Sequence, residues 1–230
     1  AEEETDHANE LGIDVIITDH HECRETLPRA IAVINPHRPD SPYPFRDLAG
    51  VGVVFKLICA CEIARSRRAG EADSEGVRRV FREFADLAAI GTIADVMPLT
   101  DENRLIVACG LSMIEKTKRP GLCALLDAVQ SGQNTRGADG GQTTHKKRRI
   151  NAGFIGFGIA PRINAAGRMA HADIAAKLFL TSDRNRADEL AARLCEINRE
   201  RQVEENRTAE EAMAKIEAER DGDRDRVVVV

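Results

Sequence analysis

The stretch Ile13-Asp14-Val15-Ile16-Ile17-Thr18-Asp19-His20-His21 decides the fold class of this chain. Its first six residues are mainly apolar and β-branched, a composition typical of a buried parallel strand. A second run of this kind covers residues 30–34 and is closed by Asn35-Pro36. Segments with helical spacing alternate with these runs. This alternation predicts an α/β fold with a parallel sheet, in which functional groups gather beyond the carboxyl ends of the strands.

The spacing of apolar residues predicts the other elements. Four prolines in residues 36–48 predict an ordered loop. Helical spacing with a thin apolar stripe, including Leu190, Leu194 and Met213, runs through 184–220. At 1.5 Å per residue this helix would be about 50 Å long, a form typical of a connector between domains. The remaining predicted helices cover residues 2–11, 50–65, 80–94, 103–116, 120–130 and 171–181.

We divide the chain accordingly into a domain at 1–182, a connecting helix at 183–222 and the first strand of a second domain at 223–230. Residues 131–149 are glycine-rich and end in Lys146-Lys147-Arg148-Arg149. We expect an insertion there that is disordered without nucleic acid. Its four charges would either raise local affinity for phosphate or belong to a solvated loop without a role.

Composition excludes several classes of function. Apolar residues make up 43% of the 230, charged residues 31%, and the net charge is −5. No apolar run approaches the roughly 18 residues of a membrane helix, so we expect no membrane partner. The negative charge argues against a protein that coats nucleic acid through bulk charge. Aromatic residues are 3% with no Trp, which argues against binding of single strands by serial base stacking.

Asp19, His20 and His21 directly follow the first predicted strand. Consecutive side chains at a strand end point in different directions, so one His can reach a metal while its neighbours support it. The alternative is a pair of surface or capping histidines. These residues alone leave both interpretations open.

Asp95 ends the apolar segment Ile90-Gly91-Thr92-Ile93-Ala94. A carboxylate in such a setting needs a partner, because an unpaired buried charge is costly. A metal ion would be one partner, and a helix end or a backbone amide another. If both His20 and Asp95 hold one ion, their side chains should lie within about 8 Å of each other.

A third group lies in Gly156-Phe157-Gly158-Ile159-Ala160-Pro161-Arg162-Ile163-Asn164-Ala165-Ala166-Gly167-Arg168-Met169. Small residues allow another backbone to approach closely. Arg162, Asn164 and Arg168 offer planar donors that suit phosphate. The alternative is a tight packing turn with solvated arginines.

Together these segments resemble the RecJ family of DHH phosphoesterases. The resemblance rests on five stretches in the family's order, at residues 11–22, 33–38, 48–53, 90–95 and 161–168. It implies a DHH domain at 1–182 and the start of a DHHA1-type domain at 223–230. The family's first two acidic motifs would lie before residue 1, which is not Met. We therefore expect a piece of a longer protein that has little or no nuclease activity alone.

The resemblance also implies a function. Enzymes of this family hydrolyse single-stranded DNA from the 5′ end with Mn²⁺ or Mg²⁺, in the cytoplasm, in repair and recombination. It makes Asp19, His20, His21 and Asp95 catalytic and metal-binding, with His20 the leading direct ligand. It places Arg162, Asn164 and Arg168 on the DNA path, and a helicase and a single-strand-binding protein among the partners. Two rival functions are a DHH phosphoesterase for oligoribonucleotides or cyclic dinucleotides, and a catalytically inactive DHH scaffold.

Overall fold

The computed structural model describes residues 2–24, 26–134, 149–169 and 171–219. Contacts divide the chain into two units. The first comprises residues 1–117 and 147–160, and the second comprises 118–146 and 161–230. None of the helices in the described residues is both long and apolar enough to cross a membrane.

The first unit begins with α1, Glu2–Glu10, and the parallel strands β1, Ile16–Thr18, and β2, Ala32–Ile34. Gly12 caps the end of this helix with a φ of +71°, a left-handed conformation that glycine adopts without steric cost. Ile16 pairs with Ala32 and Thr18 with Ile34. The fold class is therefore the predicted one, a mainly helical α/β chain with a small parallel sheet.

The strands differ from the prediction in length and burial. Each has three residues, and Ile16 is exposed over 61% of its surface. The sheet formed by the described residues has only these two strands. A β-branched run is buried only where neighbouring strands and helices cover it, and local composition does not report that cover.

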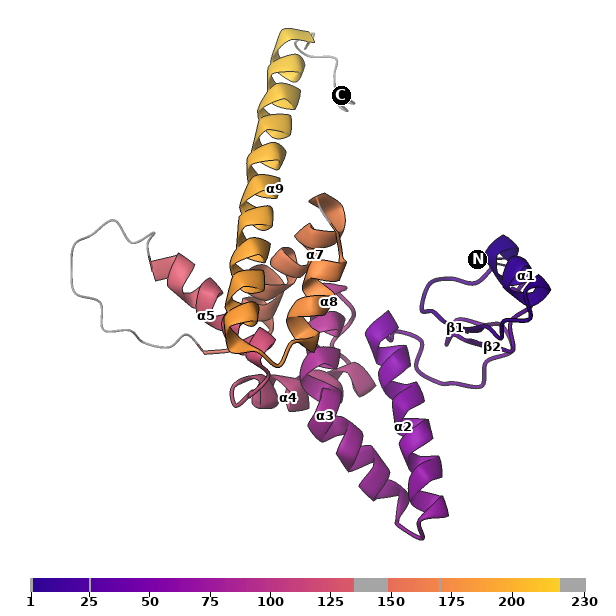
Figure 1. Ribbon diagram of the computed structural model, residues 1–230. Coiled ribbons are helices and arrows are strands. Elements are labelled where there is room, and N and C mark those ends of the chain that lie inside the picture. Colours follow the sequence, from indigo (N-terminus) through magenta and orange to yellow (C-terminus); the bar gives the residue numbers. More distant parts are fainter. Residues whose placement is uncertain (1, 25, 135–148, 170, 220–230) are drawn as a thin grey trace. The chain divides into compact units, whose positions relative to one another are not determined.

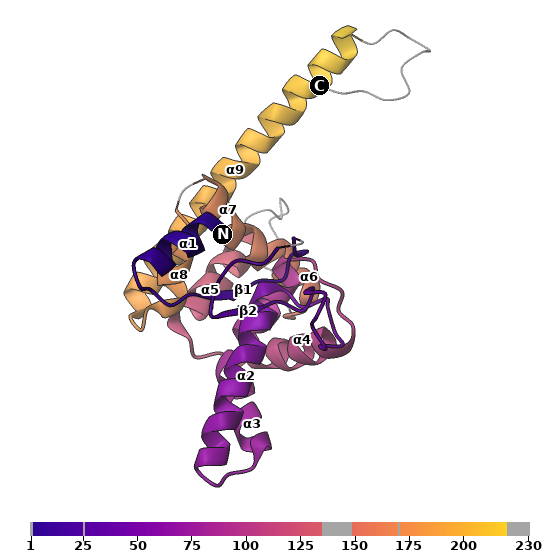
Figure 2. The same cartoon turned by 90° about the vertical axis from the view of Figure 1, so that its right-hand side faces the viewer.

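Three long helices follow in the first unit: α2, Gly50–Arg68; α3, Asp73–Ala94; and α4, Asp101–Ile114. In both views α2 and α3 lie side by side (Figure 1, Figure 2). At the turn between them, Arg79 of α3 binds Glu62 and Glu71. A core joins the three helices, with Phe55, Cys59, Val80, Ala85, Ala88 and Ile106 buried in it.

The unit continues with a short helix, α6 at Ala152–Phe154, and a π-helix, η1 at Ile155–Ile159. The helix α7, Ala160–Met169, follows directly. The tight turn considered as the alternative for residues 156–169 is therefore wrong, because these residues are helical. Pro161, which has no N–H, lies just after the π-helix, where the N–H of Ala160 still bonds the carbonyl of Ile155 and the pattern of backbone bonds changes to that of an α-helix.

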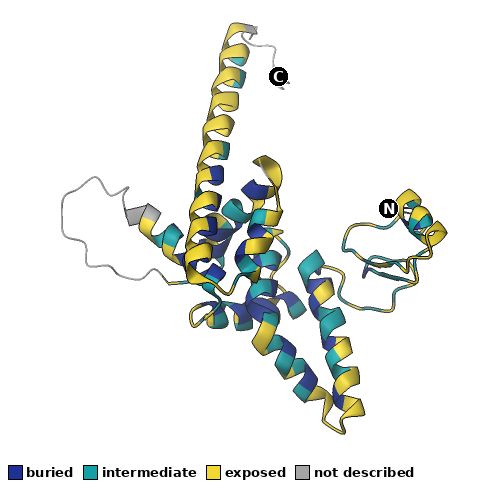
Figure 3. Cartoon of the chain, in the orientation of Figure 1, coloured by how far each residue is buried: buried dark blue, intermediate teal, exposed yellow. Residues whose placement is uncertain are grey.

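The second unit contains most of α7 together with α5, Pro120–Asn134, α8, Asp173–Leu180, and α9, Arg184–Glu219. The first half of α9 buries Leu190, Leu194 and Ile197, and its second half is exposed, as Figure 3 shows. Met213 is exposed and does not continue the predicted stripe. It lies 23 positions after Leu190, which at about 100° per residue places it about 140° around the helix.

Three domain predictions are not settled by this arrangement. The insertion predicted at 131–149 begins too early, since α5 continues through Asn134. Residues 135–148, with most of the basic run, lie outside the described residues, as does the strand predicted at 223–230. The assignment of 1–182 to one DHH domain, with 183–222 as a connector, stays a prediction. The described part of that connector is α9.

Gly121 of α5 provides a test of the packing in the second unit. A Cβ atom there would lie 1.9 Å from the backbone oxygen of Leu178 in α8. Gly121→Ala should therefore lower the free energy of unfolding by about 1–3 kcal/mol, because overpacking forces the backbone to move. The matched control is Gly167→Ala in α7, where a Cβ would meet nothing within 4 Å. That change should add about 0.5–1 kcal/mol. Urea denaturation of both variants measures the difference, and equal midpoints would contradict the close approach.

Candidate functional site

Two apolar segments of the first unit end at a common point. β1 is followed by Asp19, His20 and His21, and α3 is followed by Asp95. The Nε2 atom of His20 lies 3.4 Å from Oδ2 of Asp95. The side chain of His20 is 17% exposed and that of Asp95 is 44% exposed. The predicted convergence is therefore confirmed, and the pair has access to solvent on one side.

Asp19 organises the turn that follows β1. Its Oδ1 accepts hydrogen bonds from the backbone N–H groups of His20 at 2.7 Å and His21 at 3.3 Å. The same oxygen lies 2.8 Å from Nδ1 of the exposed His21 ring. Aspartate often forms turns of this kind by bonding the backbone just after itself.

These contacts change the acidity of Asp19. Partial burial raises the pKa of its carboxyl group, but the hydrogen bonds from the His21 ring and from the two amides outweigh burial and hold the pKa below its ordinary value. A carboxyl group whose pKa is lowered by folding stabilises the folded state above its unfolded-state pKa. That contribution is lost as the pH falls through the folded-state pKa.

The four predicted metal-site residues thus form two pairs, His20 with Asp95 and Asp19 with His21. Within the described ranges, no group of three or more His, Cys, Asp or Glu side chains is arranged to hold a metal ion. The rings of His20 and His21 are near each other, with centroids 4.3 Å apart. Asp19 fixes the turn, and His20 points to Asp95.

Asn35 is a site residue that the sequence reasoning did not single out. It follows β2 and is only 6% exposed. Its Nδ2 donates to the carbonyl of His21 at 2.9 Å, and its Oδ1 accepts from the backbone N–H of His37 at 2.9 Å. The sequence feature that could have identified it is its position directly after β2, the strand that runs parallel to the one before Asp19. Asn35 therefore ties together the two loops at this edge of the sheet.

Close packing of glycines holds the two halves of the site together. A Cβ on Gly50, at the start of α2, would lie 3.3 Å from Cδ2 of His20. A Cβ on Gly91 of α3 would lie 2.6 Å from Cγ1 of Val51. One end of α2 therefore contacts the His20 ring and also the last turn of the helix that carries Asp95. Larger side chains at these two glycines would push the pair apart.

The residue after Asp95 has a strained backbone. Val96 has a φ of +57° and is 86% exposed. The N–H of Val96 bonds the carbonyl of Ile93, and that of Met97 bonds the carbonyl of Thr92, which is the Schellman ending of a helix. Gly12 occupies the same left-handed position at the end of α1. A β-branched residue in this conformation is a true outlier. The position of Asp95 therefore depends on a helix ending that a valine disfavours.

The three predicted DNA-contact residues lie on α7 and belong to the second unit. Asn164 and Arg168 are exposed and, four positions apart, share one helix face. Arg162 is half-buried, and its Nε donates to Sγ of Cys195 at 3.3 Å. The structure thus puts two of the three on one surface. A joint path for DNA past these residues and the His20–Asp95 pair stays a prediction.

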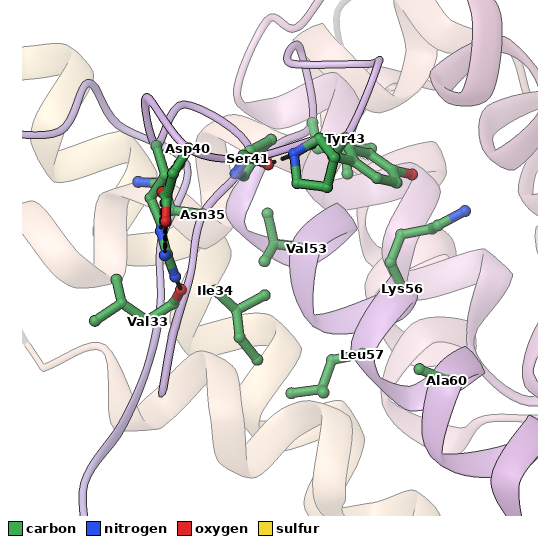
Figure 4. A pocket seen from close by; sticks show the side chains of 14 residues that line it. Val33, Ile34, Asn35, Asp40, Ser41, Tyr43, Val53, Lys56, Leu57 and Ala60 are labelled. Carbon is green, nitrogen blue, oxygen red and sulfur yellow. Dashed lines mark hydrogen bonds and ion pairs between the residues drawn. The ribbon is translucent and has the colours of Figure 1, made fainter. Parts of the chain in front are cut away.

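A separate hollow of about 500 Å³ lies between β2, the proline-rich loop and α2 (Figure 4). Its lining includes Asn35, Val53 and Leu57. Its charged groups are paired with one another or with neighbours: Lys56 lies 3.1 Å from Glu102, and Arg38 binds Asp40. Burial, together with a hydrogen bond to Glu102, raises the pKa of Tyr43 to about 12. The described residues that line the hollow therefore offer no free acid or base for chemistry.

The His20–Asp95 pair fits part of a metal site. Two ligands on adjacent positions of an octahedral ion, each at about 2.1 Å, are about 3 Å apart. The observed 3.4 Å is close to that spacing. One imidazole with oxygen donors suits Mn²⁺ or Mg²⁺ better than a metal that prefers thiolates. Two protein donors are few, and such ions commonly keep several waters.

Residues 1–92 match the family model described as DHH family, N-terminal domain. Single-stranded-DNA-specific exonuclease RecJ of Bacillus subtilis strain 168 is 42% identical over 210 residues, which are 91% of this chain. RecJ of Escherichia coli K12 is 37% identical over 94% of the chain. Over most of its length the chain is a homologue of the RecJ exonucleases.

Solved structures agree. A crystal structure of exonuclease RecJ bound to manganese superposes with a TM-score of 0.72 at 34% identity, over 93% of this chain and 48% of that one. RecJ of Thermus thermophilus in complex with Mn²⁺ gives a TM-score of 0.66 at 36% identity, over 88% of this chain and 26% of that one. The chain spans 23% of the B. subtilis relative and 36% of the E. coli relative.

Asn35→Ala should destabilise the chain, because it leaves the carbonyl of His21 and the N–H of His37 without their partner. The expected loss is about 1–3 kcal/mol in the free energy of unfolding. Asn9→Ala is the matched control, since Asn9 makes the same kind of bond to the carbonyl of Arg29 on the surface. That variant should lose less than about 1 kcal/mol. Equal losses in urea denaturation would show that Asn35 does not tie the loops.

Val96→Gly should stabilise the chain. Relief of the left-handed strain is worth about 1–2 kcal/mol, and the extra entropy of glycine in the unfolded chain costs about 0.5–1 kcal/mol, so the expected net gain is about 0.5–1 kcal/mol. Val96→Ala keeps a Cβ atom and should gain less. Urea denaturation measures both variants. A destabilised Val96→Gly variant would rule out the strain inferred at the end of α3.

Proposed function

We propose that this chain is the part of a RecJ-type exonuclease that carries the His20–Asp95 centre. The enzyme would hydrolyse phosphodiester bonds of single-stranded DNA in the 5′-to-3′ direction, in repair and recombination. The observation that carries the proposal is the 3.4 Å approach of His20 to Asp95 from segments 75 positions apart. The substrate class is that of the relatives, which are named single-stranded-DNA-specific exonucleases.

In this proposal His20 and Asp95 bind Mn²⁺ or Mg²⁺ directly. The bound ion would polarise the phosphate and lower the pKa of a water molecule. Asp19 acts on the turn: by accepting from two backbone amides and facing the His21 ring, it fixes the backbone from which the His20 ring projects. Asn35 holds the same turn from the neighbouring loop. His21 is exposed, and we assign it a contact to the ion or to the substrate phosphate.

Nucleic-acid contacts are assigned to Arg162, Asn164 and Arg168. Asn164 and Arg168 are exposed on one face of α7, and Arg162 would have to leave Cys195 to reach a phosphate. Such contacts make affinity fall with salt. A helicase and a single-strand-binding protein are the protein partners that we propose for this activity, from the resemblance to the RecJ family. DNA as the substrate would place the protein in the cytoplasm.

A catalytically inactive DHH scaffold is the rival function. It is favoured by one observation: the described residues bring only two metal donors together. The same observation leads us to expect little nuclease activity from residues 1–230 alone, since metal affinity grows with the number and charge of the ligands. Metal binding therefore tests the proposal better than hydrolysis does.

Mn²⁺ binding to the chain, measured by calorimetry, should depend on the pair. Asp95→Asn and His20→Ala should each weaken binding at least about tenfold, because the first removes the charge of one ligand and the second removes the other ligand. His7→Ala is the control, since His7 is exposed on α1 and its ring lies 3.7 Å from Glu10, away from the pair. It should bind as the wild type does. A wild-type chain that does not bind Mn²⁺, or an Asp95→Asn variant that binds equally, would support the scaffold.

A further inference from the structure

Phe157 is the only exposed aromatic ring among the phenylalanines and Tyr43, all of which lie in the described residues. Its residue surface is 88% exposed. The other six phenylalanines are buried or half-buried, as is Tyr43. An isolated exposed apolar residue needs no explanation by itself. The location of this one sets it apart.

Phe157 lies at the centre of the π-helix η1, between Gly156 and Gly158. The surrounding apolar residues face inward: Phe154, Ile155 and Ile159 are all buried. A π-helix is a rare form that occurs often at functional sites. Here three apolar neighbours stay in the core while Phe157 is exposed, and the residues on either side of it, Gly156 and Gly158, carry no side chains.

This segment packs against the helix that carries Asp95. A Cβ on Gly156 would lie 3.5 Å from Cγ2 of Ile93, which is two residues before Asp95. The π-helix and α3 belong to the same unit and contact each other. Phe157 therefore follows directly on the residue that faces the last turn of α3, the helix that ends at Asp95 of the His20–Asp95 pair.

We propose that Phe157 is a stacking platform for one base of the single-stranded DNA substrate. This inference rests on the proposed function and adds a residue to it. A phosphate held at the His20–Asp95 pair carries its base a few ångströms away, and a flat exposed ring at the end of α3 offers that base a face. Any base has such a face, so the contact is independent of sequence. The low aromatic content excludes serial stacking but leaves room for one platform.

Phe157→Trp gives a direct probe, because the chain contains no tryptophan. The emission of the free protein should be that of an exposed indole, readily quenched by acrylamide. A single-stranded oligonucleotide should quench the emission and protect the indole from acrylamide. An abasic oligonucleotide of equal length should do neither, since it offers phosphates without bases. An indole already shielded in the free chain, or equal quenching by the abasic strand, overturns the proposal.

Affinity for single-stranded DNA supplies the second measurement. Phe157→Ala and Phe157→Leu should each bind roughly tenfold more weakly than the wild type. The slope of affinity against salt should not change, because stacking releases no counterions. Leu105→Ala, at an exposed apolar residue of α4 in the same unit, should bind as the wild type does.

The outcomes separate this inference from the function on which it rests. If the wild type binds single-stranded DNA and Phe157→Ala binds it with the same affinity, the stacking platform alone is overturned. Full affinity in Phe157→Leu would show that an aromatic ring is not required and would also overturn the platform. A wild-type chain that does not bind single-stranded DNA overturns both proposals. Circular dichroism of each variant checks that the helix content of the chain is unchanged.

Discussion

Close packing at the start of α2 is the contact on which the site depends. Gly50 lies against the ring of His20, and Val51 lies against Gly91 of α3. A single helix end thus fixes the distance between the turn after β1 and the last turn of α3. No run of neighbours in sequence could set that distance, because the two segments are far apart along the chain. The 3.4 Å separation of His20 and Asp95 depends on the absence of a Cβ atom at two positions.

The loops at the edge of the sheet add a second constraint. Asp19 and Asn35 end the two parallel strands, and each uses its polar atoms on backbone groups nearby. A buried amide that bonds two loops costs much more to lose than an exposed one, because its partners have no water to replace it. This makes Asn35 structural and gives it influence on the His20 ring without any contact to a ligand. Val96 likewise influences Asp95 without contact to a ligand, because its left-handed backbone ends the helix that Asp95 follows.

The apolar surface of the two short strands and the exposed half of α9 show where local pattern stops being informative. Ile16 and Val203 have side chains typical of a core, yet both are exposed. In contrast, Leu194 and Ile197, on the same helix as Val203, are fully buried. Burial depends on what lies opposite a residue in space, and the period of a helix or strand shows only which residues share a face.

The sequence by itself determined the α/β class, the parallel pairing of β1 with β2, most of the helices and the likeness to RecJ. These follow from short-range rules, since β-branched runs, helical spacing and an ordered set of motifs are all visible along the chain. It also predicted that His20 and Asp95 would meet. Only the tertiary structure decided which donors pair, that Asn35 joins the loops, that residues 156–169 are helical, and that Phe157 faces outward. Those outcomes depend on contacts between segments distant in sequence, where a glycine, a π-turn or one amide sets the geometry.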